Sequence, residues 1–271
     1  MLVIFSAFKG EAGLIIKLLN PVKKTYIGQA VLFDGFFKGK RILVCITGMG
    51  KKAAEEAARK VISLNKTGDI AAESIFLVAG ICGASGRDLN ISDIVFYESV
   101  TDHYFIDNTE NDENDIKIKE QKKPEIYKNL SNGISIIKTK YNDKFVNASS
   151  VGGVVTKRKI KEVLSRKYKI DAFDMESFYI VKEAKKESIA VICVRSISDN
   201  LKYPVSELLV EFERGSKSKK IKTGLRIIFN PVHLKNVVLS IINIEKSLKS
   251  LNVFLANQLL PSLGYVKKRI I

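Results

Sequence analysis

Short apolar runs alternate along this chain with longer segments in which apolar residues recur every three or four positions. The short runs are typical of buried strands, and the longer segments are typical of helices that cover a sheet. The expected strands are Leu2–Ala7, Ala30–Phe33, Arg41–Ile46, Ile75–Ala79, Ile91–Tyr97, Ile134–Lys138, Ala148–Thr156 and Ile189–Val194. The expected helices begin near Gly10, pass through Ala53–Ile62, and cover Lys157–Tyr168 and Phe178–Ser188. This alternation predicts an α/β domain.

The last part of the chain has a different pattern. A short helix is expected around Leu208–Phe212, and Glu213–Lys222 is interpreted as a basic, flexible link. From His233 onward the apolar residues are spaced three and four apart, which predicts one helix of about six turns. Its stripe consists of Leu234, Val237, Ile241, Ile244, Leu248, Leu251 and Leu255. We therefore expect a main domain over residues 1–212, and over 213–271 a link and an amphipathic helix that packs on this domain or on a partner subunit.

Charge is unevenly distributed along the chain. The net charge is +16, and the stretch from Arg214 to the end holds twelve Lys or Arg residues and one acid, so it supplies +11 of that total. Such an excess can attract nucleic acid, an anionic membrane surface, or neither. The basic tail lacks interleaved aromatic residues, so no nucleic-acid partner is expected. Peripheral membrane contact stays open, because Lys235, Lys246 and Lys249 flank the apolar stripe.

Composition excludes several classes of protein. No apolar run reaches the roughly 18–20 residues needed to span a bilayer, and Met1–Phe5 reads as a first strand without a basic leader. The three cysteines lie in or beside strand-like runs, which favours buried thiols in a cytoplasmic protein over disulfides. The two histidines lie far apart without neighbours of the ligand type, so no metal and no cofactor is predicted. A cytoplasmic location is expected, with membrane association as an option.

Two acidic segments mark the candidate site. Asp174-Met175-Glu176-Ser177 precedes the helix Phe178–Ser188, and Ser198-Asp199 follows the next strand. Carboxylates at these places meet at one edge of a sheet, where open α/β folds bind ligands. Two glycine-rich exits from strands, Thr47–Lys51 and Gly80–Gly86, point to the same edge and allow a close approach of backbone to ligand. Glu11, at the start of the first helix, could belong to this site or only complement the helix dipole.

These segments together resemble a known superfamily. Ala7–Glu11, Thr47–Lys51, Gly80–Gly83, and Asp174–Glu176 with Ser198-Asp199 occur in the order and spacing of the nucleoside phosphorylases and nucleosidases. Residues 1 to 200 are most similar to the methylthioadenosine/S-adenosylhomocysteine nucleosidases and to the hopanoid-associated nucleoside phosphorylase-like proteins. The motif Asp-Met-Glu-Ser and the long basic tail favour the second group. The resemblance implies a three-layer α/β/α phosphorylase-like fold with a twisted mixed central sheet, followed here by a C-terminal helix. It also implies a homo-oligomer, with a dimer favoured.

The resemblance further implies a reaction, the cleavage of the N-glycosidic bond of a purine nucleoside, and a role for each matched residue. Asp199 would be the general acid toward the base, since a buried aspartate can hold a proton near neutral pH. Glu176 would bind the ribose hydroxyls, and Glu11 would direct the attacking water. The implied substrate-binding residues are Met175, Ile81, Cys82, Gly83, Phe8, Met49, Val154, Val155 and Ser198. The role of Asp174 stays open.

Departures from the family pattern bear on the reaction type. Phosphorylases of the hexameric type carry an arginine two residues before the glycine that matches Gly80. In this chain that position is Val78, and no arginine is near Glu11 in the sequence. The serine that follows that glycine is Ile81. We therefore expect hydrolysis of a 5′-modified adenosine, whose 5′ group is methylthio, homocysteinyl or a lipid such as a hopane. A phosphorylase and a catalytically silent nucleoside-binding relative are the alternatives.

Overall fold

The structure of the chain is a computed structural model, which describes residues 1–20, 22–66, 74–86, 88–103, 125–128, 140–141 and 145–263. The expected strand Ile134–Lys138 lies outside these residues. The described strands form one ten-stranded sheet. They are β1 (Leu2–Ser6), β2 (Val22–Ile27), β3 (Ala30–Phe37), β4 (Lys40–Ile46), β5 (Ile75–Ala84), β6 (Ile94–His103), β7 (Ile126–Lys128), β8 (Phe145–Val151), β9 (Ala172–Asp174) and β10 (Ala190–Asp199).

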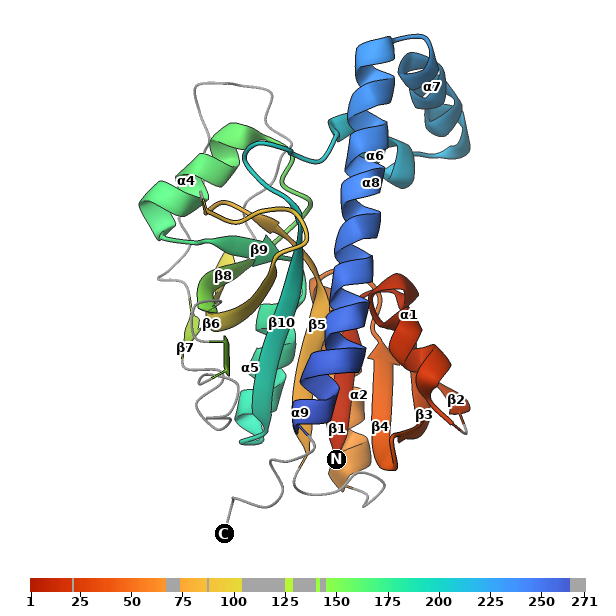
Figure 1. Ribbon diagram of the computed structural model, residues 1–271, viewed down its shortest axis with the longest axis vertical. Helices are drawn as coiled ribbons and strands as arrows, with labels where there is room; N and C mark the ends of the chain where they lie inside the picture. The colour runs from red at the N-terminus through yellow and green to blue at the C-terminus, as the bar shows by residue number, and fades with distance from the viewer. Residues whose placement is uncertain are drawn as a thin grey trace.

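The sheet is mixed and partly closed. Strand β5 pairs in parallel with β1 and β10, and β1 pairs in parallel with β4, which continues through the antiparallel β3 and β2 to the outer edge. On the other side β10 pairs with β6, β6 with β8, β8 with β9, and β9 again with β5. Five strands thus form a ring on one side of the molecule, and β1, β4, β3 and β2 extend from it as an open sheet (Figure 1).

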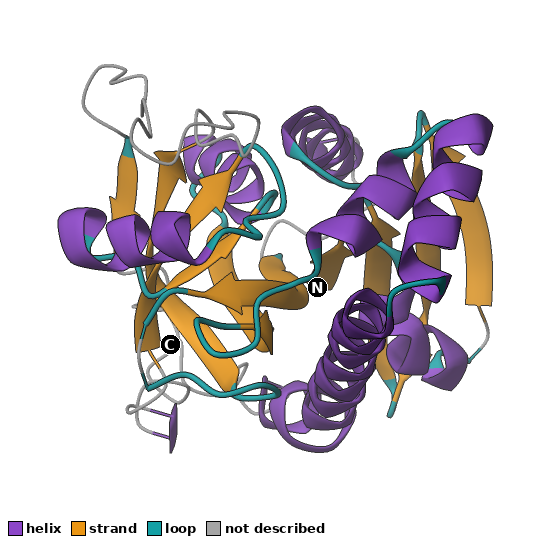
Figure 2. Cartoon of the chain, turned by 90° about the horizontal axis from the view of Figure 1, so that it is seen from above, coloured by secondary structure: helices purple, strands orange, loops and turns teal. Residues whose placement is uncertain are grey.

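Helices cover both faces of the sheet (Figure 2). Helices α2 (Lys51–Lys66) and α5 (Ser177–Lys186) pack on one face, and α1 (Lys9–Leu18) and α8 (Pro231–Phe254) pack on the other. Alternate residues of β1 show the two layers, since Val3 and Phe5 face the α2–α5 layer whereas Ile4 faces the α1–α8 layer. Helix α4 (Arg158–Tyr168) packs on the ring beside β8 and β9. The predicted α/β fold with a twisted mixed sheet is confirmed.

The C-terminal segment is more helical than its sequence suggested. Helix α6 (Glu207–Arg214) is followed by α7 (Lys217–Ile228) and then by α8, which continues through a π-helical turn η2 (Leu255–Leu259) into α9 (Leu260–Leu263). The expectation of a flexible link over Glu213–Lys222 is therefore wrong. Helix α7 forms because its inner residue Ile227 packs against Leu208 of α6 and Val237 of α8, a contact that local sequence does not show.

The predicted stripe of α8 divides into two halves. Leu251 and Leu255 are fully buried in the core layer over β5 and β10, whereas Leu234 and Ile241 near its start are exposed. Asn252 fixes α8 to α1, because its side chain accepts a hydrogen bond from Leu14 N at 2.9 Å and donates one to Gly10 O at 3.0 Å. Packing on its own domain is thus the main role of the C-terminal half, and this packing holds the helix that carries Glu11.

Candidate active site

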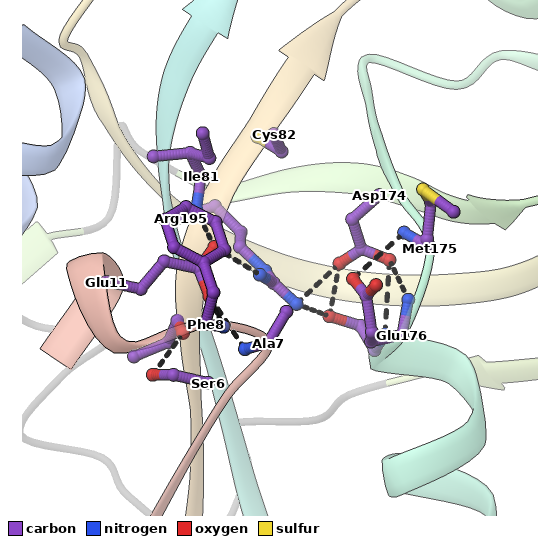
Figure 3. Close-up of polar contacts among 12 residues, drawn as sticks. Ser6, Ala7, Phe8, Glu11, Ile81, Cys82, Asp174, Met175, Glu176 and Arg195 are labelled. Atoms are coloured by element: carbon purple, nitrogen blue, oxygen red, sulfur yellow. Dashed lines mark hydrogen bonds and ion pairs between the residues drawn. The ribbon is translucent and has the colours of Figure 1, made fainter. Parts of the chain in front are cut away.

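The candidate site lies where the parallel strands β1, β5 and β10 end. Glu11, in the first turn of α1, is buried there. Its Oε2 accepts hydrogen bonds from Ala7 N at 2.7 Å and Phe8 N at 3.4 Å, and its Oε1 accepts one from Ile81 N at 2.9 Å (Figure 3). Burial raises the pKa of Glu11, and the nearby Arg195 charge and these three amides oppose the shift. The carboxylate is therefore rigidly placed, which a residue that only complements a helix dipole does not require.

Arg195 of β10 connects the two sides of the site. Its Nη1 lies 3.9 Å from Glu11 Oε1, and its Nη2 lies 2.8 Å from Asp174 Oδ2 (Figure 3). The same Nη2 donates a hydrogen bond to Ser177 Oγ at 2.7 Å. No arginine is near Glu11 in the sequence, but in space one is, because β10 is the neighbour of β5, with Arg195 opposite Gly80. A side chain at position 80 would overlap both Arg195 and Glu11, so glycine is required there.

Asp174, whose role the sequence left open, is an organising residue of the site. Its Oδ1 accepts hydrogen bonds from Ser150 Oγ at 2.7 Å and from the backbone amides of Glu176 and Ser177 at 3.2 and 3.1 Å. Its Oδ2 contacts Ser177 Oγ, Tyr97 OH and Arg195. This carboxylate caps the start of α5 and neutralises Arg195. Its oxygens are fully engaged by protein groups, so Asp174 positions other residues.

Glu176 lies between the end of β9 and the start of α5. Its Oε1 accepts a hydrogen bond from Gly50 N at 2.6 Å, and Gly50 has a φ of 86°, in the left-handed region that glycine adopts easily. The glycine turn after β4 and the acidic segment before α5 therefore meet, as the sequence suggested. Burial, followed by the neighbouring Asp174 charge, raises the pKa of Glu176 to about 7.

Asp199 ends β10 and has an unexpected partner. Lys161 of α4 is fully buried, and its ammonium forms an ion pair with Asp199 Oδ2 and donates to Asn200 O at 3.3 Å. Ser198 Oγ lies 2.9 Å from Asp199 Oδ1 and 3.1 Å from Cys82 O. The position predicted for the general acid is therefore occupied by a buried lysine–aspartate ion pair.

The remaining predicted residues differ in how far they are buried. Cys82 is buried, and Gly83 lies opposite Phe173, whose ring would overlap any side chain at position 83. Val155 is buried in a cluster with Phe173, and Val154, Met175, Ile81 and Phe8 are half-buried. Met49 is 72% exposed.

Sequence reasoning gave no role to the two buried cations, Arg195 and Lys161. Arg195 is a charged residue within a buried strand, which implies a counter-charge across the sheet. Lys161 shares the inner face of α4 with Ile160 and Leu164, so helical spacing could have indicated its burial. The many other charged residues of Lys157–Tyr168 conceal this burial in the sequence. The acids that Arg195 and Lys161 contact lie on other elements, and pairing them required the topology.

A cavity of about 740 Å³ lies beside the site, between α4 and the turns after β5 and β10. Arg158, Glu162, Asn200 and Tyr203 are among its lining residues. Asn200 borders this cavity and also accepts the hydrogen bond from Lys161. Asn200 therefore connects the cavity to the Lys161–Asp199 pair.

Comparisons with known proteins agree with this arrangement. The family model described as phosphorylase superfamily matches residues 2–228. A 5′-methylthioadenosine/S-adenosylhomocysteine nucleosidase of Buchnera aphidicola subsp. Schizaphis graminum is 27% identical over 202 residues, which cover 72% of this chain and 82% of the relative.

Solved structures show the same fold. A Helicobacter pylori 5′-methylthioadenosine/S-adenosylhomocysteine nucleosidase has a TM-score of 0.60 at 18% identity, covering 92% of this chain and 96% of its own. Futalosine hydrolase of the same organism has a TM-score of 0.58 at 17% identity, with the same coverage.

Proposed function

Since this chain belongs to the phosphorylase superfamily, we propose that it is a nucleosidase that hydrolyses the N-glycosidic bond of a 5′-modified adenosine and releases adenine. The candidate substrates are methylthioadenosine, S-adenosylhomocysteine and an adenosyl-lipid such as adenosylhopane. The carboxylates of the site support cleavage of an N-glycosidic bond. The identity of the 5′ group is a further part of the proposal.

Glu11 is the observation that carries hydrolysis. Its pKa is raised by burial, and a carboxylate with a raised pKa is a more effective base toward water near neutral pH. Arg195 Nη1 lies 3.9 Å from Glu11, and its Nη2 is engaged by Asp174 and Ser177. A guanidinium that is buried between two carboxylates in this way supports the geometry of the site.

The proposed reaction breaks the bond between C1′ of the ribose and N9 of the base. The electron pair moves into the purine, which accepts a proton at N7 from the Lys161–Asp199 pair. The ribose develops oxocarbenium character, which the buried carboxylates stabilise. Water then bonds to C1′ and gives a proton to Glu11. The proposed proton donor lies beside Gly83 and the proposed acceptor beside Gly80, three residues apart on β5.

Glu176 would bind the 2′- and 3′-hydroxyls of the ribose. Its carboxylate is fixed by Gly50 N, and Met175 beside it would pack on the sugar. Phe8 and Met49 would line the 5′ side. The exposure of Met49 in a single chain supports the further proposal that a second copy covers this side in a homodimer.

The rate of adenine release is expected to depend on pH through the protonation of Glu176. Below a pH of about 7 the side chain is protonated and loses an acceptor for the ribose hydroxyls, so kcat/KM for adenine release should fall as the pH drops through this value. Glu176→Gln should have a lower kcat/KM throughout and lack this inflexion. Glu56→Gln, at an exposed i,i+4 pair with Lys60, serves as control. An unchanged inflexion in Glu176→Gln would assign the titration to another group.

The choice between water and phosphate is tested by adenine release. The purified chain is incubated with each of the three candidate substrates, with and without inorganic phosphate, and both products are identified. We expect equal rates and a free sugar in both conditions. Strict dependence on phosphate with a sugar 1-phosphate product would make the protein a phosphorylase. Nucleoside binding without release of adenine from any substrate would indicate the silent relative.

A further inference from the structure

Five large apolar side chains form one exposed surface at the turn between α7 and α8. We call it the apolar tip, and it consists of Ile221, Leu225, Ile228, Phe229 and Val232. Their exposed fractions lie between 50% and 81%, with Phe229 the most exposed. The tip stands at the end of α8 farthest from the sheet (Figure 1).

The tip is an additional apolar face and is not a poorly packed core. Ile221, Leu225 and Ile228 are spaced by four and three residues along α7, so they share one side of the helix. The opposite side of α7 already packs against α6 and α8 through Ile227, while Thr223 Oγ1 donates to Glu211 Oε1 at 2.8 Å. The turn itself is well defined, because Asn230 Oδ1 accepts hydrogen bonds from Val232 N and His233 N. Helix α7 therefore has its packing partners and still presents a second apolar side to solvent.

Positive charge accompanies the tip. Lys219, Lys222 and Lys235 are exposed on the same two helices, and Arg226 is also exposed, paired with Glu211. Residues 214–240 hold seven Lys or Arg residues and no acid. Exposed apolar residues within a basic segment are the pattern of a helix that lies in the interface of an anionic bilayer.

This charge pattern favours an anionic bilayer over a second copy of the chain, or over nucleic acid, as the binding partner of the tip. A second copy would bring an equal excess of positive charge to the same place, and like charges oppose such an interface. An anionic bilayer offers both an apolar interior for Phe229 and negatively charged headgroups for the lysines. Polar nucleic acid would leave the apolar side chains without a partner.

The packing of α8 limits which part of the chain can insert into a bilayer. Among the described residues no single helix has the length and composition to span a membrane. Only together do 218–228 and 231–263 meet these two criteria, and a bend of 108° separates them. The second half of α8 is buried against the sheet of its own domain, with Leu251 and Leu255 in the core, so α8 cannot cross a bilayer without unfolding that core. Insertion thus excludes the second half of α8 and is left to the end of the helix where the tip lies.

We propose that the apolar tip docks this protein onto the interface of an anionic lipid bilayer, with Phe229 and its neighbours inserted among the headgroups. Helix α6 connects the tip to the rest of the domain, because it packs against α7 and its Glu207 Oε1 accepts a hydrogen bond from Thr156 Oγ1 at 3.3 Å, in the segment after β8. The inference does not depend on the reaction, since binding to vesicles is measured without substrate.

The test is sedimentation of the full-length protein with phosphatidylcholine vesicles that contain or lack phosphatidylglycerol. We expect binding to the anionic vesicles, weakened by added salt. Ile228→Ser/Phe229→Ser should weaken it at least about tenfold, because two buried apolar side chains are lost. Lys219→Glu/Lys222→Glu should weaken it on anionic vesicles through loss of charge attraction. Tyr26→Ser, at an exposed aromatic residue on β2, should bind as the unmodified protein does.

Each contrary outcome overturns the proposal in a different way. No binding to anionic vesicles, or equal binding by Ile228→Ser/Phe229→Ser, removes the tip as a membrane site. Conversion of an oligomer to a monomer by the same substitutions, measured by light scattering, would instead assign the tip to a second copy of the chain. Adenine release from a soluble nucleoside should be the same for all these variants, which separates failure of docking from failure of the proposed reaction.

Discussion

Replacing Asp199 with Asn is expected to lower the rate of adenine release by at least about 100-fold, the smallest contribution usual for a general acid. The amide retains the size and polarity of the carboxyl group, so nucleoside binding should change little. The expected result is therefore a loss of kcat with a nearly constant Kd, measured by adenine release and by calorimetric titration with a slowly cleaved substrate.

Folding must be separated from chemistry in this experiment. Asp199→Asn leaves the ammonium of Lys161 buried without its counter-charge, and such a break costs about 3–5 kcal/mol of stability. The double variant Asp199→Asn/Lys161→Met removes both charges and should recover much of that stability while remaining inactive. Recovery of activity in the double variant, or near-normal rates in Asp199→Asn, would assign the acid to another group. Asp93→Asn, at a carboxylate in the turn before β6, is the matched control.

Replacing Arg195 with Met is expected to destabilise the fold by about 3–5 kcal/mol, because Glu11 and Asp174 lose their shared cation while remaining buried. Urea unfolding measures this loss. Arg41→Met provides the contrast, since Arg41 and Asp34 form an ion pair of 2.6 Å at the surface, and such pairs contribute at most about 1 kcal/mol.

The effect of Arg195→Met should also depend on pH. Without the cation, the pKa of Glu11 rises further above its unfolded value, so the folded state binds the proton more tightly. Stability of the variant is then greatest at low pH and is lost as the pH rises through the folded pKa. The deficit relative to the unmodified protein should be larger near about pH 8 than near about pH 5. An equal deficit at both pH values would mean that the lost contacts are packing contacts and not charge pairs.

Local pattern was sufficient for most of the fold and for part of the site. The apolar runs of β1, β5 and β10 and the glycine turns after β4 and within β5 are visible in the sequence, and they indicated which residues share a sheet edge. The meeting of Gly50 with Glu176 follows from this arrangement. The roles of Glu176 and Asp199 remain predictions that the substitutions above test, and the role of Glu11 remains a prediction.

Features that depend on packing between distant segments could not be found in this way. Strand β9 has only three residues and is a strand because Gly83 and Ala84 of β5 pair with it. Helix α7 was interpreted as a link because its lysines conceal the inward contact of Ile227. The ion pairs of Arg195 and Lys161 join residues from different elements, so no local window contains both partners.

The balance of buried charge has a consequence for substrate choice. Glu11, Asp174, Glu176 and Asp199 are four buried carboxyl groups, and Arg195 and Lys161 are the two buried cations that pair with members of this set. A nucleotide would add a phosphate group with a charge of about −1.5 to −2 beside carboxylates that already occupy both cations. A nucleoside adds no charge at its ribose. We therefore expect the proposed site to bind nucleosides more tightly than the corresponding nucleotides, because of electrostatic repulsion and independently of any contact with the base.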